Sequence, residues 1–203
     1  MRKFCLCLVL VFCGVAVLAQ LPVSQEPHHS IVLENAYVRV LEGRIRTNDS
    51  TPAHLHAANS VVVFLSASTF GIATAGDGIA TAGDGIGTAG DKPVISTVRP
   101  GDLKWAPYGD KPVNHIVWNQ TPGDFHFLVV ELAPHRQVDS SRLVVGAGIS
   151  RLGRVAGARL LIVISGRVFV GGQSFGPGQV KFLFPNTLAE VKGSARCVIL
   201  TVT

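Results

Sequence analysis

The sequence predicts an all-β protein built as a sandwich or a barrel, and three observations support this fold class. Short runs of apolar and β-branched residues recur from residue 30 onward, separated by Gly, Pro and Asn. No stretch shows the apolar period of an amphipathic helix of useful length. The 203 residues are 47% hydrophobic and 15% charged, which suits one large β domain or two small ones and excludes a disordered chain.

The expected strands follow from alternation or from continuous apolar runs. Residues 36–41 alternate around Val38 and Val40, as in a strand with one buried face. Residues 60–65 are almost wholly apolar, as in a strand that is covered on both faces. The remaining expected strands span residues 94–98, 116–118, 125–132, 160–164, 167–170, 180–184, 188–191 and 196–202.

Residues 1–19 have the pattern of a signal peptide. Met1-Arg2-Lys3 is basic, and the apolar run from Phe4 to Ala16 is short for a membrane span. Val17-Leu18-Ala19 provides a small-residue cleavage site. The alternative is an uncleaved anchor, but no stop-transfer flank follows. We therefore expect an exported protein, periplasmic or secreted, with no stable membrane span after cleavage.

Charge and cysteine content narrow the function classes. The full chain carries a formal charge of +5, which becomes +3 without Arg2 and Lys3. The remaining basic residues are scattered, which argues against a nucleic-acid surface. Three of the four cysteines lie in the expected leader, so only Cys197 remains and no intramolecular disulfide is expected. Its strand-like surroundings predict a small core residue.

Residues 71–91 contain a seven-residue repeat written three times, as GIATAGD, GIATAGD and GIGTAGD. Each copy has one Asp and one large apolar residue, so three copies cannot bury a core of their own. We favour an expanded hairpin loop between two strands. The alternative is a calcium site of the kind found in Gly-Asp repeats.

Two histidines directly before an apolar run indicate a metal site. His54 and His56 are two residues apart, and such residues point to the same face of a β-strand. Because two histidines rarely hold a divalent ion alone, His115 is the candidate to complete the site. Imidazole ligands favour a divalent transition metal, namely Zn, Fe, Cu or Ni, and three of them leave positions open for water or substrate.

Four further residues are candidates for the surroundings of this metal. Asn119 shares a face with His115, and Ser60 follows the histidine pair. His126 shares a face with Leu128 and Val130 and could line a barrel, although a hydrogen-bonded core or rim histidine is the favoured interpretation.

The fourth candidate, Glu131, is a general base only if it points into the cavity, and alternation alone does not settle its face. His28 and His29 precede the first expected strand, and we expect them to be solvated. The sequence assigns no catalytic residue.

At this point two stretches resemble the paired motifs of the cupin superfamily. The first motif is G-x5-H-x-H-x3,4-E-x6-G, and His54 and His56 fill its histidine positions. Asn48 stands at the leading glycine and tolerates positive φ. The glutamate is absent, and Ser60 or Val61 occupies its place.

The second motif is G-x5-P-x-G-x2-H-x3-N, and its positions are all occupied. The matching residues, with three extra residues before the histidine, are Gly101, Pro107, Gly109, His115 and Asn119. The similarity covers roughly residues 35–133. It implies a cupin-type jelly-roll β-barrel over residues 36–135, preceded by an N-terminal segment, residues 20–35.

Residues 136–203 resemble a second, shortened cupin unit. Leu161 to Gly166 is similar to the strand and turn after a first motif, and Gly176 to Pro185 is similar to the glycine-to-proline span of a second. No histidine follows His135, so this unit cannot build an imidazole site. We interpret it as a degenerate half with a structural role or a homodimer surface. The alternative is one enlarged barrel whose edge strands come from this tail.

Two functions from different classes remain. The favoured hypothesis is an exported cupin-type protein that binds a small molecule at a metal held by His54, His56 and His115, with no assigned reaction. The alternative is a metal-dependent enzyme of dioxygenase, isomerase or hydrolase type acting on a small polar substrate. The missing glutamate also allows a vestigial, metal-free barrel with a structural role.

Overall fold

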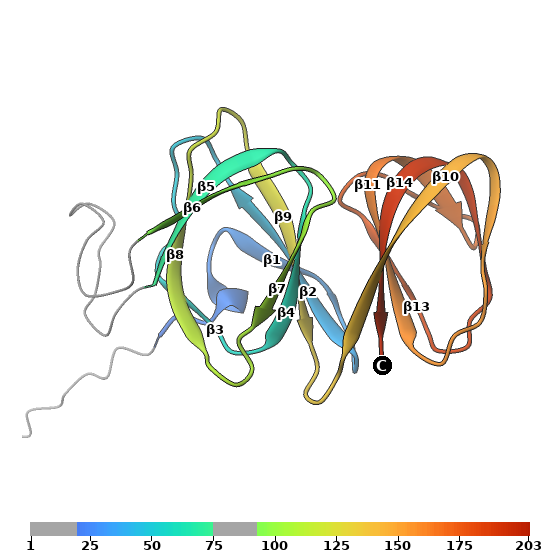
Figure 1. Cartoon of the computed structure of the whole chain (residues 1–203), viewed down its shortest axis with the longest axis horizontal. Helices are drawn as coiled ribbons and strands as arrows, with labels where there is room; N and C mark the ends of the chain where they lie inside the picture. The colour runs from blue at the N-terminus through green and yellow to red at the C-terminus, as the bar shows by residue number, and fades with distance from the viewer. Residues whose placement is uncertain (1–19, 75–92) are drawn as a thin grey trace, which may run out of the picture.

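The computed structural model describes residues 20–74 and 93–203, and these residues form strands almost throughout (Figure 1). Within them, the one helical element is the 3-10 turn η1, Val23–Gln25. The all-β prediction is confirmed. The strands are β1 His29–Glu34, β2 Val38–Ile45, β3 His54–His56, β4 Asn59–Phe64, β5 Ser68–Thr74, β6 Val94–Val98, β7 Leu103–Pro107, β8 Val113–Asn119, β9 Phe125–Leu132, β10 Val138–Leu152, β11 Ala158–Val170, β12 Gln173–Phe175, β13 Val180–Leu183 and β14 Ala189–Val202.

A membrane-spanning helix is not found among these residues, since no helix there has the length and apolar character to cross a bilayer. The expected signal peptide, residues 1–19, lies outside the described residues.

The N-terminal unit is a barrel of two antiparallel sheets that face each other (Figure 1). The first sheet has the strand order β1-β2-β9-β4-β7, and the second has the order β3-β8-β5-β6. β2 and β9 pair along their full length, from Val38 opposite Leu132 to Ile45 opposite Phe125. Apolar side chains of both sheets fill the interior, and they include Phe64, Phe70, Val117, Phe125 and Phe127.

The first sheet of the barrel is apolar on both faces. On β9, Phe127 and Val129 point into the barrel, whereas Leu128 and Val130 point to the opposite face. Strands that are buried on both faces have continuous apolar sequences instead of alternating ones. The interpretation of residues 60–65 as a strand covered on both faces is therefore confirmed, because β4 lies beside β9 in this sheet.

The C-terminal unit forms a separate sheet that covers the outer face of the barrel sheet (Figure 1). Its strand order is β10-β14-β11-β12, with β13 also paired to β11. Leu160, Ile162 and Leu200 pack against the barrel sheet in one shared core. Leu161 and Cys197 belong to a second core on the other face, which confirms Cys197 as a core residue. The alternative of one enlarged barrel is wrong, because these strands form their own sheet.

Two long strands of this unit, β11 and β14, each cover a region that the sequence predicts as two shorter strands. β11 continues through residues 165–166, with a register shift between Val163 and Ser165 in its pairing to β14. Gly166 has a φ of +81°, and a Cβ there would come within 2.1 Å of the Ser194 carbonyl oxygen. The sequence indicates a turn at such a glycine, but here it allows a strand to bend and continue.

Residues 20–35 supply β1, one of several strands that the sequence analysis did not identify; the others include β5 and β10. β1 pairs with β2 at the edge of the barrel sheet, and His29 lies opposite Gly43.

On the second sheet, β5 contains the first residues of the heptapeptide repeat and pairs with β6, with Ile72 opposite Val94. An antiparallel pair on either side of the repeat agrees with the expected hairpin. Residues 75–92, and with them the loop itself, lie outside the described residues.

The shared core predicts that the two units unfold together. Leu200 is fully buried in this core, and Leu200→Ala should lower the free energy of unfolding by about 2–5 kcal/mol. Both tryptophans, Trp105 and Trp118, belong to barrel strands, so their fluorescence reports on the other unit. We expect the fluorescence-detected denaturant midpoint to fall with Leu200→Ala and to stay unchanged with Leu188→Ala, which alters a side chain that is 56% exposed. An unchanged midpoint in both variants would show that the units unfold independently.

Candidate metal centre

The histidine pair lies on β3 with both imidazoles buried in the barrel. His54 and His56 are 0% and 4% exposed, and Leu55 between them points the other way. β3 pairs with β8 so that His54 lies directly opposite His115. The ring centroid of His115 is 4.8 Å from each of the other two, and those two are 5.1 Å apart. The structure therefore brings the three predicted ligand residues together.

A fourth histidine joins this cluster from β1. The ring of His29 is 5.1 Å from that of His54 and 6.2 Å from that of His56, measured between centroids. One nitrogen from each of His29, His54 and His56 lies within 4.8 Å of the other two, so these atoms could hold one ion. The expectation that His29 is solvated is wrong, because pairing of β1 with β2 turns its side chain into the barrel, where it is 8% exposed.

The hydrogen bonds of two of these imidazoles leave one nitrogen of each free for a ligand. His54 Nδ1 donates to the carbonyl oxygen of Pro52 at 2.9 Å, which leaves Nε2 as the atom with the lone pair. His29 Nδ1 donates to Glu26 Oε2, which leaves its Nε2 in the same state. Such a bond fixes both the tautomer and the orientation of a metal-binding histidine.

Several of the buried nitrogens have no protein partner. Among the described residues, His54 Nε2, His56 Nδ1 and His115 Nδ1 are buried without a hydrogen bond. A buried polar atom left unpaired costs about 1–3 kcal/mol, so three of them in one place require an explanation. A metal ion satisfies imidazole lone pairs, and the donor set therefore fits a bound ion.

The electrostatics keep these imidazoles neutral, which is the form that binds metal. Burial lowers the pKa of His54 to about 4, and the neighbouring imidazole of His29 acts in the same direction. Burial, together with His54, lowers the pKa of His56 to about 3. The pKa of His115 is also well below its usual value, because of burial first and the neighbouring histidines second.

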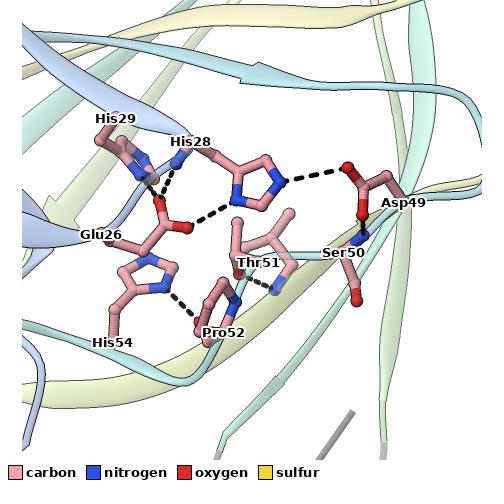
Figure 2. A network of polar contacts seen from close by, with 9 residues as sticks. Glu26, His28, His29, Asp49, Ser50, Thr51, Pro52 and His54 are labelled. Carbon is pink, nitrogen blue, oxygen red and sulfur yellow. Dashed lines mark hydrogen bonds and ion pairs between the residues drawn. The ribbon is translucent and has the colours of Figure 1, made fainter. Parts of the chain in front are cut away.

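A buried carboxylate supports the cluster from behind (Figure 2). Glu26 is 1% exposed and accepts hydrogen bonds from His29 Nδ1, from the backbone N–H of His28 at 3.0 Å and from His28 Nδ1 at 2.6 Å. Nε2 of His28 continues the network to Asp49 Oδ2 at 3.2 Å. Burial alone would raise the pKa of the Glu26 carboxyl, but these bonds lower it to about 2. Glu26 therefore places a full negative charge one hydrogen bond away from the candidate ligand set.

The four imidazoles line one part of a cavity of about 60 Å³ inside the barrel. This volume is far below that of an ordinary pocket for a drug-sized ligand and suits an ion with a small molecule. The rest of the wall is mainly apolar. Besides the histidines, its lining residues are Ser60, Val62, Phe64, Phe70, Ile72, Lys104, Ala106, Tyr108, Val117, Phe125, Phe127 and Val129.

Comparisons with solved structures identify this fold. HutD from Pseudomonas fluorescens SBW25 matches with a TM-score of 0.52 at 14% identity, over 82% of this chain and 78% of that one. Bacillus subtilis oxalate decarboxylase matches with a TM-score of 0.55 at 10% identity, over 83% and 69%. The vicilin from Solanum melongena matches with a TM-score of 0.56 at 8% identity, over 81% and 74%.

The chain has the cupin fold. At these identities the likeness shows the fold alone. No protein-family model matches the sequence, and no curated protein matches it.

The position of the cupin glutamate is occupied by a small polar residue. Ser60 lines the cavity, as the sequence suggested, and its Oγ donates to the carbonyl oxygen of Ala58 at 2.9 Å. The described residues that line the cavity include no carboxylate. Asn48, which replaces the leading glycine of the same motif, has a φ of +59°, and its interpretation as a residue in positive φ is confirmed.

Asn119 closes the end of the barrel and does not line the cavity. It is 2% exposed, and its Nδ2 donates to the carbonyl oxygens of Ile45 at 3.1 Å and Gly123 at 2.7 Å. Its Oδ1 accepts from the backbone N–H of Thr121 at 2.9 Å and from the Ser68 hydroxyl at 3.2 Å. With both ends of its amide bonded to the chain, Asn119 connects strand ends and leaves no group for a ligand.

His126 and Glu131 lie on opposite faces of β9, and neither lines the cavity. His126 shares the outer face with Leu128, and its Nε2 is 2.7 Å from Glu42 Oε1, so the favoured interpretation as a hydrogen-bonded histidine is confirmed. Glu131 shares the inner face with Val129 but accepts a hydrogen bond from Arg39 Nε at 2.8 Å and lines a separate groove. It is therefore not placed to act as a base at the histidines.

The lowered histidine pKa values predict how the metal-free protein responds to acid. An unfolded histidine binds a proton near pH 6.5, whereas His54 and His56 do so only near 4 and 3 when folded. The unfolded chain therefore binds more protons in this range, and the free energy of unfolding should fall as the pH drops below 6.5, by up to about 1.4 kcal/mol per pH unit for each histidine.

This slope can be measured as the melting temperature of chelator-treated protein between pH 6.5 and 5, a window above the titration range of ordinary carboxylates. The double variant His54→Gln/His56→Gln should show a shallower decline than the unaltered protein. Parallel curves for the two proteins would contradict the assignment of buried, neutral imidazoles.

Proposed function

We propose that this chain is a metal-binding cupin whose buried ion binds a small molecule. The ion is held by His29, His54 and His56, and His115 borders the same site. One observation carries the proposal. His29, His54 and His56 each offer one ring nitrogen, and these three atoms lie within 4.8 Å of one another. Unpartnered buried nitrogens on His54, His56 and His115 support it independently.

The donor set indicates which class of metal it would take. Neutral imidazoles favour Zn, Fe, Cu or Ni over Mg and Ca. Among the structural neighbours, Bacillus subtilis oxalate decarboxylase has Mn(II) centres, which supports a divalent metal on this fold. Three protein ligands leave coordination positions open, and a bound ion supplies Lewis acidity to a molecule that occupies them.

Small-molecule binding is favoured over a defined enzymatic reaction. A carboxylate that acts as general base must lie within hydrogen-bond reach of the bound molecule. No carboxylate lines the cavity within the described part of the chain, and Glu131 is paired with Arg39 elsewhere. The buried Glu26–His29 pair argues against a vestigial site, since it keeps one imidazole oriented toward the others. Export is part of the proposal, on the leader pattern of residues 1–19.

Metal content of protein purified without a histidine tag tests the proposal. We expect about one transition-metal ion per chain by elemental analysis after incubation with Zn, Fe, Cu or Ni salts. His29→Ala and His54→Ala should each remove most of it. The matched control is His135→Asn, because His135 is exposed and has a φ of +64° that Asn tolerates. Protein that takes up none of the four metals would contradict the metal centre.

Glu26 should strengthen metal binding although it is not a ligand. Glu26→Gln keeps the shape of the side chain but removes the charge that His29 Nδ1 donates to. We expect the metal affinity to fall about 10–100-fold, as for other partners of ligating histidines. Asp49→Asn is the control, since Asp49 contacts His28 and not His29. Competition with a chromophoric chelator measures the metal affinities. Equal metal affinities for Glu26→Gln and Asp49→Asn would exclude a role of Glu26 in metal binding.

A further inference from the structure

The candidate metal site has an excess of positive charge. Its direct donors are imidazoles, and an imidazole binds a metal ion in its neutral form. A divalent ion bound there keeps its full charge, since the described cavity wall contains no carboxylate. The carboxylate of Glu26, which is hydrogen-bonded to His29, offsets one unit of this positive charge. Uncompensated charge in an apolar enclosure is costly, so the open coordination positions favour an anionic ligand.

A second positive group lies in the wall of the same cavity. Lys104 belongs to β7, the edge strand, and pairs with Val62 on β4. Both residues line the cavity, together with Ala106 on the same face of β7. Lys104 is an exposed residue that also borders the surface, and among the described residues its ammonium group makes no hydrogen bond or ion pair. It is nevertheless close enough to contribute to the lowered pKa of His115.

A surface groove adjoins this wall. The groove has a volume of about 640 Å³ and lies between β6, β7 and β10, where the two units meet. Phe64, Phe70 and Lys104 line both the groove and the cavity, so these three side chains form the partition between them. Arg142 adds a second cation to the groove. Asp102 also lines the groove, and its carboxylate accepts a hydrogen bond from the backbone N–H of Arg99 at 2.8 Å.

We propose that the site binds a small organic anion, whose charged group lies between the metal and Lys104 and whose apolar body lies against Phe64 and Phe70. The inference rests on the metal centre proposed above and adds the class of its ligand and a specificity-determining residue. The cavity of about 60 Å³ has room for the charged group and a short apolar portion. The aromatic wall excludes inorganic oxyanions as the preferred ligands, because they leave this apolar surface uncovered.

Straight-chain carboxylates and their amides test the proposal as matched probes. Acetate, butyrate and hexanoate would be titrated into the metal-loaded protein by calorimetry, with acetamide, butyramide and hexanamide as neutral counterparts. We expect the carboxylates to bind and the amides to bind at least tenfold more weakly. Each added methylene group that is buried should tighten binding roughly fourfold.

The Lys104→Met variant tests the contribution of the lysine to ligand binding independently of the metal. This variant keeps the length and apolar character of the side chain, and the metal content should be unchanged. We expect it to weaken carboxylate binding about tenfold or more, as for loss of a hydrogen bond to a charged group. Lys192→Met is the control, since Lys192 lies on β14 and is 54% exposed in its side chain. Equal affinities for carboxylates and amides, or for Lys104→Met and the unaltered protein, would overturn the proposal.

The same titration on metal-free protein distinguishes failure of this inference from failure of the metal centre. Carboxylate binding that needs Lys104 but persists without metal would overturn the position of the charged group between metal and lysine, and the metal centre would still be decided by metal content. A stoichiometric metal with no carboxylate binding would leave the metal centre standing and refute the anion site. Absence of both would refute both proposals.

Discussion

The enclosure of several neutral imidazoles in an apolar barrel is the constraint on which the rest of the site depends. His54 Nε2, His56 Nδ1 and His115 Nδ1 are buried with no partner among the described residues. At about 1–3 kcal/mol each, such atoms cost a sizeable part of the 5–15 kcal/mol by which a domain is typically stable. The barrel tolerates them because its remaining interior is a dense aromatic core around Phe64, Phe125 and Phe127. A bound ion offsets the cost at the point where it arises.

The negative charge next to the site comes from Glu26, which precedes β1, and not from the glutamate position of the cupin motif, which lies on β4 of the same sheet. Ser60 or Val61 stands at the motif position of the glutamate, and the Ser60 hydroxyl bonds to the backbone. Glu26 instead holds its charge beside His29 on β1, one hydrogen bond outside the ligand set. The direct donors are then all neutral, and the ion would keep more of its charge for an incoming ligand.

The sequence predicts strands well where local pattern decides them and less well where pairing does. β6 and β9 have the bounds expected from their apolar runs, and the i, i+2 spacing places His54 and His56 on one face of β3. The strand that carries His29 was not predicted, because its position depends on pairing with β2, opposite Gly43. Alternation along β9 separates His126 from Glu131, but it does not identify the inner face. Both faces of that strand are apolar, so only the packing of the C-terminal unit decides which face is the outer one.

The C-terminal unit therefore affects the site although it has no histidine. By covering the outer face of the barrel sheet, it allows β4 and β9 to be apolar on both sides, which holds the cavity wall rigidly in place. By placing β10 beside β6 and β7, it also forms one side of the groove that borders the cavity. Ser140, Ser141 and Arg142 reach this groove from β10. A unit that contains no histidine thus supplies part of the surroundings of the histidine site.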